Sequence, residues 1–174
     1  LYIEYNSKNE NALGYFKVEI INPYTSKFFS DKIKLNCIVS ALELIKILTV
    51  EGQENIKIYK LIDELFILLN KENWSYEYVF LELNLLKFIG FDLNIKDYCK
   101  HEIADNYKRY YIENSQKKMI VPNFLIEDYI DNNISNKDIY NSLNLISEYM
   151  KKNIFIPNNI NFPISRKIFI NQFK

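Results

Sequence analysis

Two residues that can bind metal or take part in nucleophilic chemistry stand close together in the segment LLKFIGFDLNIKDYCKH. They are Cys99 and His101, the only histidine of the chain. A structural zinc site needs four ligands, usually in two close pairs, and the other cysteine, Cys37, has no neighbouring ligand in the sequence. Residues two positions apart also rarely face each other as a nucleophile and its base must. We therefore predict no metal and no catalytic residue, and the lack of a phosphate-binding glycine loop predicts no cofactor.

A carboxylate, Glu82, lies inside the most apolar stretch of the chain, WSYEYVFLELNLLKFIG. When this stretch is wound at about 100° per residue, Glu82 falls opposite Asn84 and among Leu85 and Leu86. A buried carboxylate without a partner is costly, so we expect a hydrogen-bond donor or a cation beside it. A structural ion pair or helix cap is favoured over catalysis, because no second acid or base stands nearby in the sequence.

The elements that must position these residues are predicted to be mainly helical. The helix that carries Glu82 begins at Trp74 and ends at Gly90, which favours the left-handed conformation of a helix end and lets Phe91 fold back over it. Apolar residues at three- and four-residue steps predict two earlier helices, and such wide stripes need partners in a bundle. These earlier helices are predicted over Ser26–Val50 and Ile56–Leu69.

Short strands and further helices complete the expected architecture. Apolar residues predict two short strands at Tyr2–Tyr5 and Leu13–Ile20, and the alternation within the second is that of a half-buried strand. A β-hairpin is expected over Arg109–Glu113 and Lys118–Val121. Ser135 and Asp138 form a capping-box pattern that opens a helix reaching Met150. Shorter helices are expected over Asn123–Asp131 and Ser165–Phe173.

Charge is balanced overall but unevenly distributed. The formal net charge is +0, which does not by itself indicate a nucleic-acid-binding protein. From Tyr149 to Lys174, however, there is no acidic residue, and a second group of cations surrounds the predicted hairpin. Two cysteines give no disulfide framework, so a reducing cytosolic setting is the default, and no apolar run is long enough to span a bilayer.

The order of these motifs resembles RecO, the bacterial DNA repair and recombination mediator family. The family's hallmark is a helix that starts at a tryptophan, continues into Gly-Phe and closes on a cysteine, and the final helix carries a Ser-Arg pair. Asp92 replaces the family's second glycine. The matching positions are Trp74, Glu82, Leu83, Leu85, Leu86, Gly90, Phe91, Leu93, Ile95, Cys99, Ser165 and Arg166.

The resemblance implies a fold and a domain division. Residues 1–21 would be the last strands of an N-terminal OB-fold barrel, and residues 22–174 the helical C-terminal domain with its small β-hairpin. Most of the barrel would be missing, so the chain looks like a fragment or a truncated copy. Some family members bind zinc through two Cys-x-x-Cys pairs. Here Glu102 stands where the second cysteine would be, which implies the zinc-free kind.

The resemblance also implies a function without catalysis. RecO proteins bind single- and double-stranded DNA, anneal complementary strands, engage the acidic tail of single-stranded DNA-binding protein, and join RecR to load the recombinase RecA. A cytoplasmic location at the bacterial nucleoid follows, with no membrane partner. We expect structural roles for Trp74, Glu82, Gly90 and Phe91.

Binding of DNA needs cations for phosphates and aromatic faces for bases. Tyr107, Tyr110 and Tyr111 interleave with the hairpin cations. Arg166 falls on a family motif, but it could equally be the partner of Glu82. The expected nucleic-acid-binding residues are Lys108, Arg109, Lys117, Lys118, Lys151, Lys152, Arg166 and Lys167.

The main alternative is a helical docking module. In that reading, an apolar groove with nearby cations receives an acidic peptide tail, and the chain does not bind DNA. An enzyme is the weakest reading, because no catalytic motif is present in the sequence.

Overall fold

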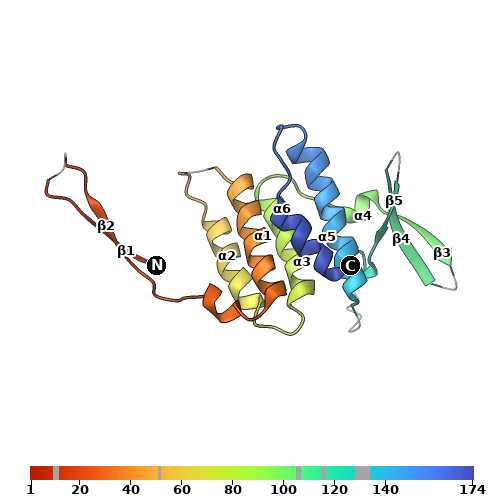
Figure 1. The fold of residues 1–174 in the computed structure, drawn as a ribbon. Coiled ribbons are helices and arrows are strands. Elements are labelled where there is room, and N and C mark those ends of the chain that lie inside the picture. The colour runs from red at the N-terminus through yellow and green to blue at the C-terminus, as the bar shows by residue number, and fades with distance from the viewer. Residues whose placement is uncertain (10–11, 51, 105–106, 115–116, 128–133) are drawn as a thin grey trace.

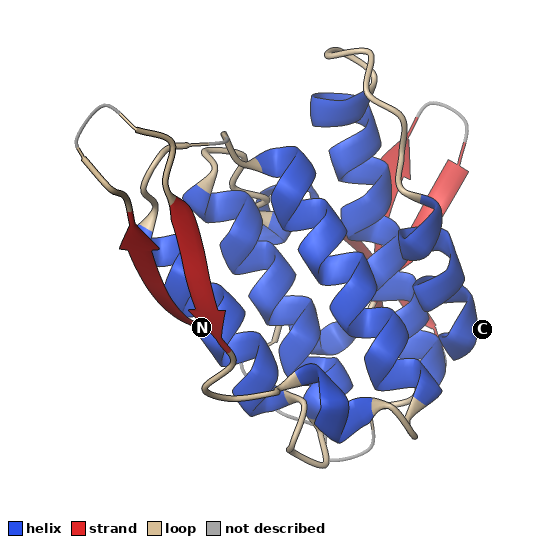
Figure 2. Ribbon diagram, turned by 60° about the vertical axis from the view of Figure 1, so that its left-hand side comes forward, coloured by secondary structure: helices blue, strands red, loops and turns tan. Residues whose placement is uncertain are grey.

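The computed structural model describes residues 1–9, 12–50, 52–104, 107–114, 117–127 and 134–174, and for residues 104, 107, 114 and 117 the backbone alone. The predicted fold class is confirmed: helices form the body of the protein, and two small antiparallel sheets lie on opposite sides of it (Figures 1 and 2). No helix in these ranges is long and apolar enough to cross a membrane.

Three long helices form one half of the helical body. They are α1 (Lys32–Leu48), α2 (Ile56–Leu68) and α3 (Trp74–Phe88), which lie side by side in Figure 1. The helix expected from Ser26 begins later, because the Asp31 side chain accepts hydrogen bonds from the N–H groups of Ile33 and Lys34 at 3.1 Å and so caps α1 at this point.

The second half of the body comes from the C-terminal part of the chain. Helix α5 (Asn136–Met150) packs against α3, and α6 (Ile164–Ile170) packs against α1. The capping box at Ser135 and Asp138 is present as expected. After Met150 the helix widens into a π-helical turn over Lys151–Phe155, and the short turn Asn171–Phe173 follows α6.

The end of α3 has the geometry that its sequence predicted. Gly90 has a φ of +85°, and the N–H of Phe91 donates to the carbonyl of Leu86 at 2.9 Å. This hydrogen bond closes the helix end and turns the chain so that Leu93 is buried. A short helix, α4 (Ile95–Tyr98), follows.

The N-terminal hairpin lies apart from the helices. Strands β1 (Tyr2–Asn6) and β2 (Tyr15–Glu19) pair antiparallel, with Ile3 opposite Val18 and Tyr5 opposite Phe16. The expectation that the second strand is half-buried is wrong, because every residue of β2 is exposed. The physical reason is visible in Figure 1, where the hairpin projects away from the helical body.

The second sheet has one strand more than the sequence predicted. Strand β3 (Lys100–Ala104) joins β4 (Tyr107–Asn114) and β5 (Lys117–Val121) in the order β3-β4-β5. Strand β5 packs against α5. Only a short turn, Asn123–Leu125, forms where a helix to Asp131 was expected, and residues 128–131 lie outside the described part.

The core lies between the helices and is closed by aromatic side chains. Trp74, at the start of α3, contacts Phe169 and Phe173 with ring centroids 6.4 and 6.2 Å apart. The ring of Tyr78, one turn further along α3, meets Phe169 edge-on at 5.3 Å. The lone tryptophan therefore anchors the C-terminal segment against the central helix.

Candidate nucleic-acid interface

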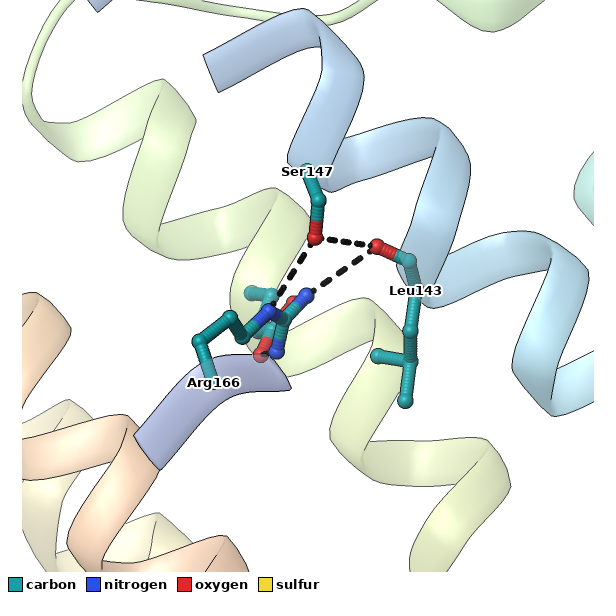
Figure 3. A network of polar contacts seen from close by, with 4 residues as sticks. Leu143, Ser147 and Arg166 are labelled. Atoms are coloured by element: carbon teal, nitrogen blue, oxygen red, sulfur yellow. Dashed lines mark hydrogen bonds and ion pairs between the residues drawn. The ribbon is translucent and has the colours of Figure 1, made fainter. Parts of the chain in front are cut away.

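Arg166 lies in the interior of the protein, with 0% of its surface exposed. Its Nη1 and Nη2 donate to the two carboxylate oxygens of Glu82, with Nη2 at 2.6 Å from Oε2. Its Nε donates to Ser147 Oγ and Nη2 also donates to the Leu143 carbonyl, both at 3.2 Å (Figure 3). This corrects the expectation that Arg166 contacts nucleic acid, because its guanidinium is out of reach of any external phosphate.

The ion pair is buried, and the attraction between its two charges keeps Arg166 protonated in spite of that burial. Burial alone lowers the pKa of Arg166, but attraction to Glu82 outweighs it and the pKa is raised. Burial, followed by the negative charge of Glu82, raises the pKa of Tyr78 and of Cys37 well above their ordinary values. Cys37 and Tyr78 are therefore neutral, and the cluster joins α3, α5 and α6 structurally.

The hairpin cations divide between the two faces of the β3-β4-β5 sheet. One face turns towards the helices, because it carries buried Val121 and half-buried Ile112 and Met119. Successive side chains of a strand alternate between faces. Arg109 therefore lies on the opposite, outward face, whereas Lys108 is exposed on the same face as Ile112. Lys118 also lies on the outward face. The side chains of Lys117 and Tyr107 are outside the described part.

We call the outward-facing residues of this sheet the outer sheet face. Lys118 Nζ lies 3.9 Å from the Tyr111 ring centroid and 2.6 Å from Glu102 Oε2. Lys100 Nζ lies 2.8 Å from Glu113 Oε2. The face consists of Lys100, Glu102, Arg109, Tyr111, Glu113, Lys118 and Ile120.

The charges of the outer sheet face are closely coupled. A hydrogen bond from Lys100, together with its charge, lowers the pKa of Glu113, and the same contact raises the pKa of Lys100. Sequence reasoning missed Lys100 and Glu102, because β3 was not predicted. Residues 100–104 give only a weak strand signal, because the polar His101 lies on the same face as Ile103, where a half-buried strand would have a second apolar residue.

The C-terminal cations that remain accessible lie at the end of α5 and on α6. Lys151 is held by Glu148, with Nζ 2.5 Å from Oε1, and lies 4.8 Å from the Phe162 ring centroid. Lys152 is exposed in the π-helical turn, and Lys167 is exposed on α6. Because Arg166 is buried, the positive charge on the surface of residues 149–174 comes from lysines alone.

A groove connects Lys152 to the sheet. It has a volume of about 370 Å³ and lies between α4, α5 and the inward face of β4 and β5. Its wall is apolar, formed by Leu93, Ile112, Met119 and Leu145, and Lys152 stands among the polar residues that line it. Glu113 and Glu148 also line it, and both carboxylates are paired with lysines.

Cys99 and His101 do not converge on a common site. The Cys99 thiol lies 3.6 Å from the carbonyl of Lys100, and His101 is exposed with its ring 6.1 Å from that of Tyr110. Burial raises the pKa of the Cys99 thiol, so it is a weak nucleophile at neutral pH. In the part of the chain that the structure describes, no three His, Cys, Asp or Glu side chains lie close enough to hold a metal ion.

The amino-acid sequence matches one family model over more than half of its length. That model is described as "Recombination protein O C terminal", and it matches residues 30–119. The chain belongs to the RecO family. Membership places it, in general terms, in DNA repair and recombination, with DNA and recombination proteins as the classes of partner.

Curated RecO relatives align with nearly the whole chain. The DNA repair protein RecO of Wolbachia sp. subsp. Drosophila simulans (strain wRi) is 24% identical over 193 residues, covering 98% of this chain and 78% of its own length. That of Ehrlichia chaffeensis (strain ATCC CRL-10679 / Arkansas) is 25% identical over 173 residues, covering 90% and 71%. No solved structure matches the chain significantly.

The RecO match includes most of the features described above. It begins just before α1 and ends at Met119 in β5, so Glu82, Gly90 and most of the outer sheet face fall within it. Arg166 lies beyond the matched residues, yet it completes the RecO core by neutralising Glu82.

Proposed function

We propose that this chain is a recombination mediator without catalytic activity, which binds DNA through its exposed lysines. The observation that carries the proposal is the charge of residues 149–174, which contain no acid and expose Lys152, Lys167 and Lys174. Membership in the RecO family supports it. The candidate DNA contacts are Lys108, Arg109, Lys117, Lys118, Lys151, Lys152 and Lys167.

The proposed activity extends to the other steps of the RecO pathway. The chain binds single- and double-stranded DNA and anneals complementary strands. Together with RecR, it helps load RecA onto DNA that single-stranded DNA-binding protein covers. Neutralising phosphates lowers the repulsion between two strands, so one cationic surface serves both binding and annealing. The site of this work is the cytoplasm, at the bacterial nucleoid.

The proposal assigns residues 1–21 to a separate unit. We interpret β1 and β2 as the last strands of an OB-fold barrel and residues 22–174 as the helical C-terminal domain. The exposure of Ile3, Tyr5, Phe16 and Val18 on one face of the hairpin supports this, because such a face needs a partner.

The test is the salt dependence of DNA binding. We expect a fluorescein-labelled oligonucleotide to bind with an affinity that falls steeply as salt rises, because phosphate contacts release counterions. The variant K152A/K167A should bind more weakly, and its slope of log K against log salt should be smaller by about 1.4 for single strands. K32A/K60A removes the same charge from exposed positions on α1 and α2 and serves as the control. Absence of binding at low salt would refute the proposal.

A second candidate function is suggested by the groove beside Lys152. Its apolar wall and its lysine suit an acidic peptide tail, the class of ligand that the resemblance implies for single-stranded DNA-binding protein. A docking module of this kind binds a labelled acidic peptide but no oligonucleotide. M119E, which places a charge on the apolar wall, should abolish peptide binding, whereas I120E, on the outer sheet face, should not.

A further inference from the structure

The outer sheet face has an aromatic ring at its centre with cations around it. Tyr111 lies on the middle strand, opposite Lys100 of β3 and Ile120 of β5. The ammonium group of Lys118 crosses the Tyr111 ring, 3.9 Å from its centroid, and Arg109 stands two residues along the same strand. Tyr111 is half-buried, so part of its ring remains accessible. Cations that flank an accessible ring are the arrangement that suits single-stranded nucleic acid, since phosphates bind the cations and a base stacks on the ring.

Two of the cations on this face, Lys100 and Lys118, are paired with carboxylates of the same face. Directly across the strands, Glu102 is opposite Arg109 and Glu113 is opposite Lys118. The ion pairs instead run diagonally, from Lys118 across Tyr111 to Glu102 and from Lys100 to Glu113. The side chains in these pairs are 47–62% exposed. Exposed pairs contribute little to stability, so another anion can displace the carboxylates at small cost.

The proposed DNA-binding function gives these contacts a meaning, and the following inference rests on it. We propose that the outer sheet face is a binding site for single-stranded nucleic acid, in which Glu102 and Glu113 hold Lys118 and Lys100 until phosphates displace them. A base then stacks on Tyr111 in the place that the Lys118 side chain leaves. The strand must be single, because the bases of a duplex do not present their faces to a side chain on a sheet.

The carboxylates should therefore weaken binding and flatten its salt dependence. Each phosphate that binds a lysine releases counterions from the nucleic acid, but each displaced carboxylate attracts cations from solution and offsets part of that release. The variant E102Q/E113Q removes this uptake with little change in side-chain shape. We expect it to bind a labelled oligothymidine at least roughly threefold more tightly at low salt, with a steeper salt slope.

A matched control separates this local effect from a general change of net charge. E54Q/E72Q removes two acids that are exposed outside the sheet, before α2 and before α3. This variant should bind with nearly the affinity and salt slope of the original chain. If E102Q/E113Q binds no more tightly than E54Q/E72Q, the inference is overturned.

The stacking partner is tested by Y111L. Loss of the ring should weaken binding roughly tenfold while the salt slope stays the same, because stacking releases no counterions. Tyr59 is 68% exposed on α2, and Y59L is the matched control. An unchanged affinity in Y111L, with the fold verified by circular dichroism, would also overturn the inference.

The result for this site is distinguishable from the result for the proposed function. If the original chain binds DNA through Lys152 and Lys167 while E102Q/E113Q and Y111L behave like their controls, only the outer sheet face is excluded. If neither the original chain nor E102Q/E113Q binds at low salt, both proposals fail. Binding by E102Q/E113Q alone would refute the proposed function of the original chain, and it would also overturn the inference, because the carboxylates would then not be displaced at small cost.

Discussion

Arg166 of α6 and Glu82 of α3 form a two-point ion pair in the centre of the protein, 84 positions apart in the chain. Arg166 has 0% and Glu82 2% of its surface exposed. The planar guanidinium matches the carboxylate with parallel hydrogen bonds, and its remaining donors reach Ser147 and Leu143 of α5. One side chain thus fixes three helices relative to one another.

We predict that R166L strongly destabilises the fold. It leaves the Glu82 carboxylate buried without a cation, and breaking a buried pair in this way costs about 3–5 kcal/mol. Urea unfolding followed by the fluorescence of Trp74 measures the loss. K167L, at the neighbouring exposed position of α6, should change the unfolding free energy by about 0.5 kcal/mol or less.

The double variant E82L/R166L should be more stable than R166L alone. Removing both charges leaves no uncompensated carboxylate, and apolar side chains of similar volume often replace a buried pair at little cost. The same urea titration gives the comparison. A double variant that is less stable than R166L would show that the pair matters through packing rather than through charge.

Replacement of Gly90 should test the end of α3. Gly90 has a φ of +85°, and a β-carbon there would meet no atom within 4 Å, so only the backbone conformation opposes a side chain. We expect G90A to lower the unfolding free energy by about 1 kcal/mol. G90N should cost less, because asparagine adopts the left-handed conformation more readily than alanine. Equal losses would contradict this account.

Truncation of Phe169 should release the C-terminal helix from Trp74. Phe169 is fully buried and contacts both Trp74 and Tyr78, so F169A should cost about 3–5 kcal/mol. The emission of the only tryptophan should shift to longer wavelength as water reaches it. I168A, at a half-exposed position of the same helix, is the control and should leave the emission unchanged.

The two cysteines should differ in reactivity. Cys37 is fully buried and its pKa is raised well above the ordinary value by burial, whereas Cys99 is partly exposed. A thiol reagent such as dithionitrobenzoate should modify Cys99 in the folded protein and both thiols in urea. Because burial also raises the pKa of Cys99, its rate should increase with pH above neutrality. Rapid modification of Cys37 in the fold would contradict its placement.

Local signals in the sequence were sufficient to predict α1, α2, α3, α5 and α6, but not the short helix α4. The apolar period, the capping pattern at Ser135 and the glycine at position 90 act within a few residues. Each of these helices therefore forms close to the positions that its own residues indicate. The burial of Glu82 followed from the same period. Helix α1 begins at Lys32 rather than at the predicted Ser26, because Asp31 caps it, and the apolar pattern carries no information about this cap.

The sequence by itself thus determined most of the helices and the need for a partner at Glu82, because these follow from short-range periodicity and from the cost of a buried charge. The tertiary structure decided which cation answers that need, which lysines remain on the surface, and that Lys100 and Glu102 join Lys118 on one face. Those outcomes depend on contacts between residues far apart in the chain, and no local pattern encodes them.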